Sequence, residues 1–398
     1  MLRLKNKESH QANSQMATDV IAHDFADPYL ELMRLLHQAA GLEQLLMLQY
    51  LYAAFSIKDE YASVRGGLGP HLYLDADTSD LLGVSVQEMQ HLHWVNEYLV
   101  ALGAAPNLAP QEMPYASDVY PFELTLKPLS RYTTATYLFI EADDCALSLK
   151  CKHSDAEIHY IKSVLAVLGQ TRENHLGSLY ASIIGLTRRV AQNPPAFLSP
   201  TTDWNRFENT MLYIAAQGEE KHYQFFKSVF TASHPGFGGV DVWNFAPDDA
   251  RYPSVQFDPN QTTAYAGQEN EICDPVLRDI AWLSNLHYWI ILSALDASYR
   301  FGAPKLRMKA VGNMTEALYS LAFCLARKGI GVPFDPPGME NSLGSDLHSS
   351  LQILRCLVLE AEALANRLSP VLPPDFNFKV YPQTLAGLLP AEVAAVPS

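Results

Sequence analysis

The stretch GEEKHYQFF, residues 218–226, places two glutamates, a lysine and a histidine directly before an aromatic run. Glu219 and His222 are three residues apart, so they lie on one face of an α-helix. The aromatic residues that follow indicate that this face is buried. An isolated buried charge costs several kcal/mol or more, so both groups must be paired, neutralised or bound to a metal. The stretch therefore predicts a core helix that carries a polar site.

A second glutamate–histidine pair with the same spacing occurs earlier in the chain. Glu88 and His91 lie near the middle of a helical pattern that spans about 78–102. The Ser/Asp-rich DTSD sequence begins this helix, and Gly103 with Pro106 just beyond ends it. Its apolar residues share a face with the pair, which predicts that the pair is buried.

Glu43 is an acidic residue within the first long helical pattern, about 28–57. It is the one acid between Glu31 and Asp59, and it shares a face with Leu36 and Tyr50. Apolar residues recur at helical spacing along this whole segment. We therefore expect the Glu43 carboxylate to be buried as well.

Helical signals continue through the rest of the chain and predict an all-α fold. A fourth bundle helix is expected at about 204–230, and the stretch 134–149 favours a helix. A capping box at Ser154 begins further helical signal that runs to Asn193. The Pro-rich segment 104–130 is typical of a crossover loop between parallel second and third helices. Three more helices are expected near 274–300, 303–328 and 344–368.

These elements predict a four-helix bundle with a long crossover loop and an appended C-terminal helical region. The expected organisation is a flexible N-terminus (1–27), a metal-binding bundle (28–233), a linking loop (234–270) and a C-terminal helical region with a Pro-rich tail (271–398).

The acidic residues at core positions indicate a site for two metal ions. One Glu from a helix and a Glu-x-x-His from each of two others are the ligands of a di-iron bundle, which needs a further carboxylate from the remaining helix. Two divalent cations compensate four buried carboxylates, and mixed oxygen and nitrogen ligands suit iron or manganese. A lone Glu-x-x-His is most often a solvated pair. Two Glu-x-x-His pairs in separate helices, together with a core-facing Glu, are much less likely to occur by chance than one such pair.

The ligand from the third helix has three candidates. Glu173 falls on the face of Leu176 and Tyr180, so it can point inward, and it is the preferred choice. His175 lies on the adjoining face. Glu141, in the preceding segment, is the more distant rival.

Three motifs resemble a known family. They are GLEQLLMLQYLYAAFSI (41–57), VQEMQHLHWVNEYLVALGAAPNL (86–108) and IAAQGEEKHYQFF (214–226). They are similar to the ferritin-like domain of the iminophenyl-pyruvate dimer synthase family, whose members in the violacein and rebeccamycin pathways oxidatively couple amino-acid-derived imines. The resemblance covers about 30–230. Ser178 stands where the family often has a Glu, so either Glu173 replaces that ligand or the site has one carboxylate fewer.

The resemblance implies a ferritin-like bundle that binds two irons, with manganese as the alternative. The implied ligands are Glu43, Glu88, His91, Glu219 and His222, with Glu173 added. O2 would be the co-substrate of a non-haem oxidase or oxygenase in secondary-metabolite biosynthesis, acting on a small amino-acid-derived molecule. We expect Tyr50, Tyr180 and Tyr223 to line the pocket for an apolar or aromatic substrate. The alternatives are iron oxidation without an organic substrate and a metal-free helical binding module.

Composition restricts the partners. With 28 Lys and Arg against 43 Asp and Glu, the net charge is −15, which disfavours binding to nucleic acid. We expect neither a nucleic-acid partner nor a membrane, and a homodimer stays open. The N-terminus lacks the apolar segment of a signal peptide, so a cytoplasmic location is expected. The five scattered cysteines are expected to be free thiols, most of them buried, with no disulfide framework.

Overall fold

The computed structural model describes residues 25–67, 79–109, 125–143, 145–169, 177–263, 267, 269–337, 344–372 and 376. Most of the expected N-terminal segment, crossover loop and C-terminal tail lies outside these residues. The described elements are helical, with two isolated β-bridges and no strand among them. The predicted all-α class is therefore confirmed.

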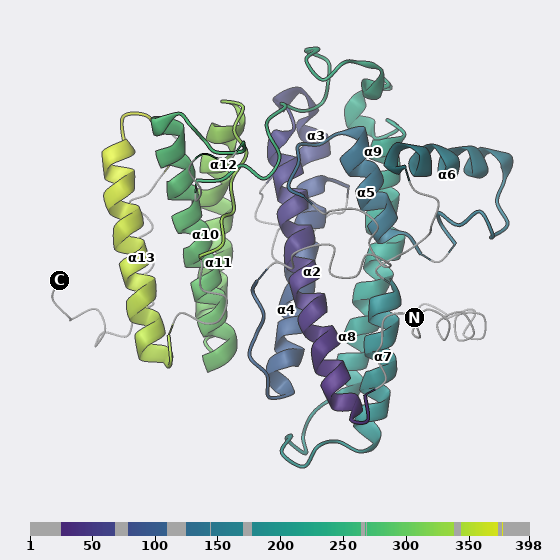
Figure 1. Cartoon of the computed structure of the whole chain (residues 1–398), viewed down its shortest axis with the longest axis vertical. Helices are drawn as coiled ribbons and strands as arrows, with labels where there is room; N and C mark the ends of the chain where they lie inside the picture. The colour runs from purple at the N-terminus through teal and green to yellow at the C-terminus, as the bar shows by residue number, and fades with distance from the viewer. Residues whose placement is uncertain are drawn as a thin grey trace.

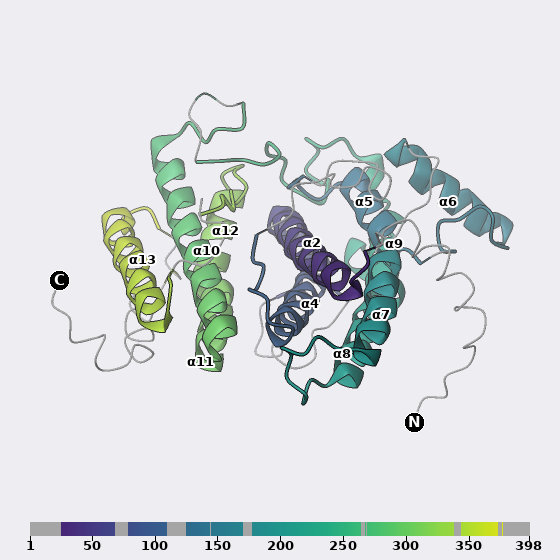
Figure 2. The same ribbon diagram turned by 60° about the horizontal axis from the view of Figure 1, so that its bottom comes forward.

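The first two long helices form an antiparallel pair at the centre of the molecule (Figures 1 and 2). Helix α2 spans Pro28–Ser56, and the Asp27 side chain caps it by accepting from the Tyr29 amide. Helix α4 spans Leu81–Ala101 with Asp80 as its N-cap. The Tyr29 hydroxyl donates to the Leu102 carbonyl at 2.7 Å, which places the start of α2 beside the end of α4. Both expected helices are confirmed.

The third helix of the bundle is divided into two. Helix α5 (Arg131–Glu141) packs against the upper part of the fourth helix, and α7 (Gly177–Gln192) packs against its lower part and α2. Between them, α6 (Asp155–Leu168) projects from the bundle (Figure 1). The capping box predicted at Ser154 is present. The expected continuous helix is broken at Gly169, where the backbone is left-handed with φ of 66°.

The chain direction agrees with the expected crossover. Ser56, at the end of α2, accepts a hydrogen bond from the amide of Leu129, just before α5. Since α4 is antiparallel to α2, both α4 and α5 begin near the end of α2 and run in the same direction. The middle of the crossover segment, 110–124, is outside the described residues.

The fourth helix contains a change of helical pitch. Helix α8 (Trp204–Gln217) continues as the π-helix η3 (Gly218–His222) and then as α9 (Tyr223–Phe230). The predicted helix at 204–230 is confirmed, but its central turn is wider than an α-helical turn. Such π-helical turns are frequent at functional sites.

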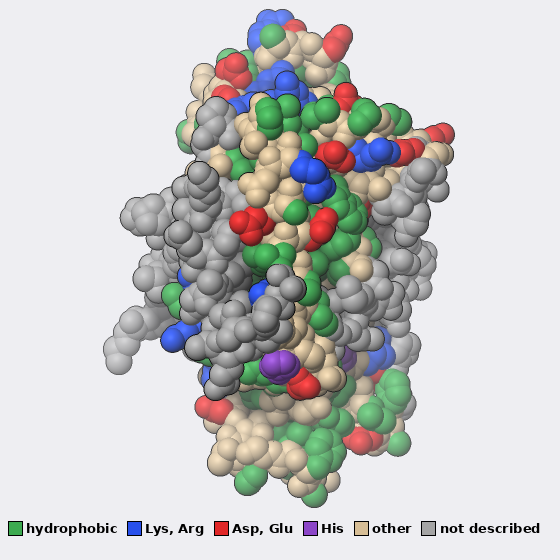
Figure 3. All heavy atoms as spheres, turned by 90° about the vertical axis from the view of Figure 1, so that its left-hand side faces the viewer, with side chains coloured by type: hydrophobic (Ala, Val, Ile, Leu, Met, Phe, Trp, Pro, Cys, Tyr) green, Lys and Arg blue, Asp and Glu red, His purple; other side chains and the backbone are tan. Residues whose placement is uncertain are grey.

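The C-terminal helices form a second layer beside the bundle. Helix α10 (Pro275–Phe301) packs against α4, and α12 (Tyr319–Ala326) packs against α2, while α13 (Leu347–Leu368) covers the outer side of α10. Charged and apolar side chains lie interspersed on the described part of the face that shows α13 (Figure 3). The layer also contains α11 (Pro304–Asn313) and the π-helix η6 (Met314–Leu318).

The prediction of free thiols is confirmed for three cysteines, but the predictions of no disulfide and of mostly buried thiols were wrong. Cys145 and Cys151 form a disulfide between α5 and α6. Cys273 and Cys356 are exposed, and Cys324 is half-buried. The physical reason for the error is the chain turn after Glu141, which brings two cysteines six residues apart together with a Cα–Cα distance of 5.6 Å. In the described part of the chain, no helix is long and apolar enough to cross a membrane.

Candidate metal centre

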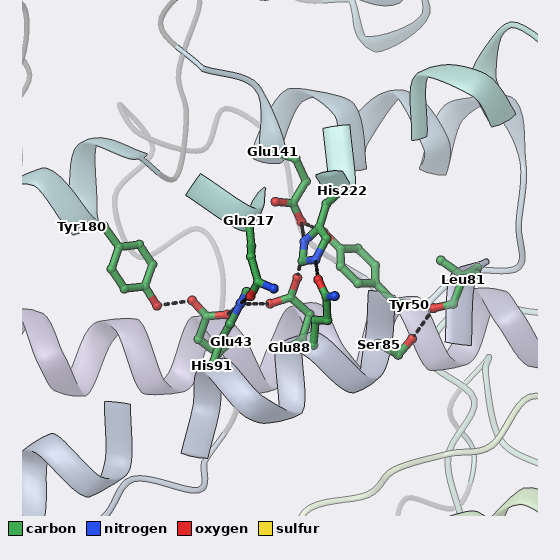
Figure 4. A network of polar contacts seen from close by, with 11 residues as sticks. Glu43, Tyr50, Leu81, Ser85, Glu88, His91, Glu141, Tyr180, Gln217 and His222 are labelled. Atoms are coloured by element: carbon green, nitrogen blue, oxygen red, sulfur yellow. Dashed lines mark hydrogen bonds and ion pairs between the residues drawn. The ribbon is translucent and has the colours of Figure 1, made fainter. Parts of the chain in front are cut away.

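Five buried titratable side chains meet inside the bundle (Figure 4). Each is 2% exposed or less. Their ligand atoms form two groups that share Glu88, and within each group these atoms lie within 4.8 Å of one another. The first group is Glu43, Glu88 and His91, and the second is Glu88, Glu141 and His222.

Glu88 lies between the two histidines. Its Oε2 is 3.0 Å from His91 Nδ1, and its Oε1 is 2.9 Å from His222 Nδ1. The outer carboxylates approach the same nitrogens. Glu43 Oε2 is 3.4 Å from His91 Nδ1, and Glu141 Oε1 is 3.5 Å from His222 Nδ1. The cluster is therefore nearly symmetric about Glu88.

Tyrosine hydroxyls hold the two outer carboxylates. Tyr180, on α7, donates to Glu43 Oε1, and Tyr50, on α2, donates to Glu141 Oε1 (Figure 4). Glu43 thus keeps its second oxygen, Oε2, toward His91, whereas Glu141 uses the same oxygen, Oε1, for Tyr50 and for the side that faces His222. Tyr223 instead donates to the carbonyl of Ala146 at 3.3 Å. All three tyrosines were expected to line a substrate pocket, and two of them contact candidate ligands directly.

Glutamine side chains orient the two imidazoles. Gln217 Oε1 is 2.9 Å from His91 Nε2, and Gln87 Oε1 is 2.8 Å from His222 Nε2. An amide oxygen only accepts, so Nε2 of each ring carries a hydrogen. A neutral ring then presents the lone pair of Nδ1 to the carboxylates. A lone pair facing carboxylate oxygens is stable only with a cation or proton between them.

The pKa shifts show the charge that the cluster favours. Burial, reinforced by Glu88, raises the pKa of Glu43 to about 8. Burial alone would lower the pKa of His222, but Glu141 and Glu88 outweigh it and raise this pKa to about 9. Burial alone would raise the pKa of the Glu88 carboxyl group, but His91 and His222 outweigh it and hold this pKa below its usual range. The protein therefore surrounds this space with groups that attract positive charge.

The donor set fits two divalent metal ions. Among the described residues, neither Glu43 Oε2 nor His222 Nδ1 has a hydrogen-bond partner, although both are buried and face the cluster. Three carboxylates and two imidazoles offer the oxygen and nitrogen ligands that iron and manganese prefer. Two divalent cations would also compensate the buried negative charge.

A small cavity adjoins the cluster. It measures about 10 Å³, which is room for one water-sized molecule. Its polar wall is formed by Glu88, His91, Glu141 and Glu219, and Ile140 and Ile214 contribute to its apolar wall. The cavity therefore has room for one small molecule beside the candidate ligands.

Comparison with known proteins agrees with this geometry. Residues 36–231 match a family model described as ferritin-like. The chain contains a ferritin-like domain. The Glu/His cluster and the bundle apart from the first eight residues of α2 fall within the matched residues, which confirms the resemblance seen in the motifs.

One curated relative of the ferritin-like chain is an enzyme. The chain is 26% identical over 346 residues to dichlorochromopyrrolate synthase from Lentzea aerocolonigenes. The alignment covers 73% of this chain and 34% of that enzyme, so the chain spans about a third of the length of its relative. No solved structure matches the chain.

The structure of the ferritin-like domain brings together four of the six predicted ligands, namely Glu43, Glu88, His91 and His222. Glu219 is half-buried and lines the small cavity, outside both groups of ligand atoms. The wider π-helical turn at 218–222 is the physical reason, because it rotates Glu219 relative to His222 compared with an α-helix. Glu173 and its rival His175 lie outside the described residues. The other rival, Glu141, reaches the cluster.

Sequence reasoning missed three residues that shape the centre: Gln87, Gln217 and Gly218. Gly218 has an ordinary helical φ of −59°, so its backbone does not require glycine. A Cβ at this position would lie 2.7 Å from Glu141 Oε2. The missing side chain therefore makes room for a candidate ligand.

We expect the Gly218→Ala variant to fold and to bind metal more weakly at the Glu141–His222 group. The added methyl must displace the Glu141 carboxylate, which Tyr50 otherwise holds in place. A shifted ligand should weaken that site about 10- to 100-fold. Titration of the metal-free protein with Fe(II) under anaerobic conditions measures this change. Ala216→Gly, an exposed substitution two residues earlier, is the control. Equal Fe(II) affinity in the wild type, Gly218→Ala and Ala216→Gly would contradict the expectation.

Proposed function

We propose that this protein binds two irons and uses O2 to oxidise a small organic molecule. The buried cluster of three carboxylates and two imidazoles, in two groups that share Glu88, is the observation that carries this proposal. The proposed substrate class is an amino-acid-derived or secondary-metabolite compound, and oxidative coupling of imines is the proposed type of reaction.

The residues of the chain have separate roles in this proposal. Bound irons would supply the electrons that reduce O2. Tyr50 and Tyr180 keep the outer carboxylates in place, and Gln87 and Gln217 keep Nδ1 of each histidine toward the centre. The small cavity beside these residues would hold one small molecule such as O2.

The comparison supports an organic substrate. The relative is a synthase, and its alignment covers 73% of this chain. The alignment covers 34% of the length of that enzyme, so the complete reaction of the enzyme is not proposed for this protein. The substrate class therefore rests on the motifs and on the relative together.

A specific observation also favours a second function, which is iron oxidation without an organic substrate. The cavity of about 10 Å³ beside the cluster holds one water-sized molecule and has no room for an aromatic compound. In this second candidate, O2 would oxidise the bound iron alone.

Oxygen consumption by the iron-loaded protein distinguishes the two functions. We expect O2 uptake to continue past the amount that the loaded iron alone reduces when an aromatic amino acid or its imine is present. Uptake that stops after one oxidation of the bound iron, with every organic compound tested, would favour the second function. Glu97→Gln, a half-exposed substitution on α4, should behave as the wild type, and His222→Ala should show no uptake above background.

A further inference from the structure

A large apolar cavity lies between the bundle and the C-terminal helical layer. It measures about 560 Å³, within the range of small-molecule binding sites. Side chains of α2, α4, α10 and the helices after it form its walls. These walls include Met47, Phe55, Met89, Leu292, Met314 and Phe334.

This cavity is separate from the candidate metal centre. On α4, Val86, Met89 and His93 face the large cavity, whereas Glu88 and His91 face the cluster. At about 100° per residue, these two sets point to roughly opposite sides of the helix. The helix pair α2 and α4 thus stands between the cavity and the metal ligands.

Among the described residues that line this apolar cavity, Arg307 is the single Lys or Arg. Arg307 donates to His93 Nε2, and His93 Nδ1 is 3.2 Å from the Tyr299 hydroxyl. Burial, together with Arg307, lowers the pKa of His93 to about 4, so the imidazole is neutral at pH 7. The contact with His93 therefore does not neutralise Arg307.

Arg307 differs from the other arginines nearby. Arg206 pairs with Glu97 at 3.0 Å, and Arg300 pairs with Asp296 at 3.2 Å. No carboxylate within the described ranges forms an ion pair with Arg307. Glu97 Oε1 lies 3.5 Å from His93 Nε2, so a carboxylate is close to the contact between Arg307 and His93 without pairing directly with Arg307. A guanidinium that lacks a direct ion pair beside an apolar cavity attracts an anion.

Arg307 lies on a part of the cavity lining that reaches the protein surface. Arg307 is half-buried, and the neighbouring Met308, which also lines the cavity, is 67% exposed. The interior walls are apolar and contain several methionines, whose flexible side chains adapt to ligands of different shape. A ligand would therefore place its charged end at Arg307 and its apolar body inside.

We propose that this cavity binds an amphipathic monocarboxylate, with its carboxylate on Arg307 and its apolar body between α4 and α10. Arg307 offers two parallel N–H donors that match a carboxylate. The proposal is independent of the function proposed for the metal centre, because it concerns the other side of α2 and α4.

Calorimetric titration of the full chain tests this site. The probes are decanoate, its neutral counterpart decanol, and 4-phenylbutanoate, which compares an aliphatic with an aromatic body. We expect decanoate, 4-phenylbutanoate or both to bind with a stoichiometry of one molecule per chain. Each carboxylate that binds should bind about tenfold more tightly than decanol. In Arg307→Gln this advantage should disappear, with the affinity for decanol unchanged.

Two further variants complete the experiment. Arg206→Gln removes a neighbouring arginine that pairs with Glu97, and it should leave carboxylate binding unchanged. Leu292→Trp fills the cavity and should abolish binding of all three probes. Circular dichroism verifies that each variant is folded. Equal binding of carboxylates and decanol, no saturable binding of either carboxylate, or unchanged carboxylate affinity in Arg307→Gln would overturn the proposal.

Discussion

Glu88→Gln is expected to lose both metal ions. The Glu88 carboxylate belongs to both groups of ligand atoms, and its two oxygens face different histidines at 3.0 and 2.9 Å. A neutral amide removes a charge from both sites at once. We expect the affinity of each site to fall by at least about a hundredfold, more than the usual loss of an outer hydrogen bond. Metal analysis of protein loaded with Fe(II) and then desalted measures this loss.

Glu97→Gln is the matched control for this experiment. Glu97 lies on the same helix, but it is half-exposed and pairs with Arg206 outside the cluster. This variant should keep the metal content of the wild type. Retention of both ions in Glu88→Gln would show that Glu88 does not join the two sites.

Metal removal is expected to destabilise the fold strongly. The native state gathers five ligands from α2, α4, α5 and η3, and the unfolded chain does not. A ligand that binds only the native state at a thousand times its Kd stabilises it by about 4 kcal/mol for each site. Two occupied sites should therefore raise the free energy of unfolding by about 8 kcal/mol. Urea unfolding of metal-free and iron-loaded protein measures the difference.

The same unfolding experiment with Glu88→Gln provides the control. We expect added Fe(II) to leave the stability of this variant nearly unchanged, because both sites are impaired. Equal stability of the metal-free and loaded wild type would contradict the metal centre. It would favour the alternative in which the helices form a binding module without metal.

Three of the candidate ligands that could be predicted from the sequence lie on uninterrupted α-helices. Glu43, Glu88 and His91 are found on the core faces of α2 and α4, where one helical period describes the whole segment. Burial at these positions follows from the apolar residues at i±3 and i±4. His222 lies in the π-helical turn η3, yet it could also be predicted, because the aromatic run that follows it indicates burial.

The residues that sequence reasoning placed less well lie where helical regularity ends. Glu141 is the last residue of α5, and its place in the third bundle helix depends on the interruption before α7. A reading that assumes one continuous third helix therefore favours a later residue such as Glu173. Glu219 lies in a π-helical turn, which residue periodicity alone does not reveal. The role of Gly218 depends on a tertiary contact with Glu141.

The disulfide shows the same limit of sequence reasoning. Cys145 and Cys151 pair because the chain turns between α5 and α6. Neither the spacing nor the apolar surroundings of these cysteines indicates that turn.

An anomalous-diffraction map of crystals of the iron-loaded protein tests the central claim most directly. We predict two iron peaks inside the bundle, one in contact with Glu43 and His91, the other with Glu141 and His222, and both beside Glu88. A map from loaded crystals with no peak at these residues, or with a single peak elsewhere, would contradict the two-metal centre.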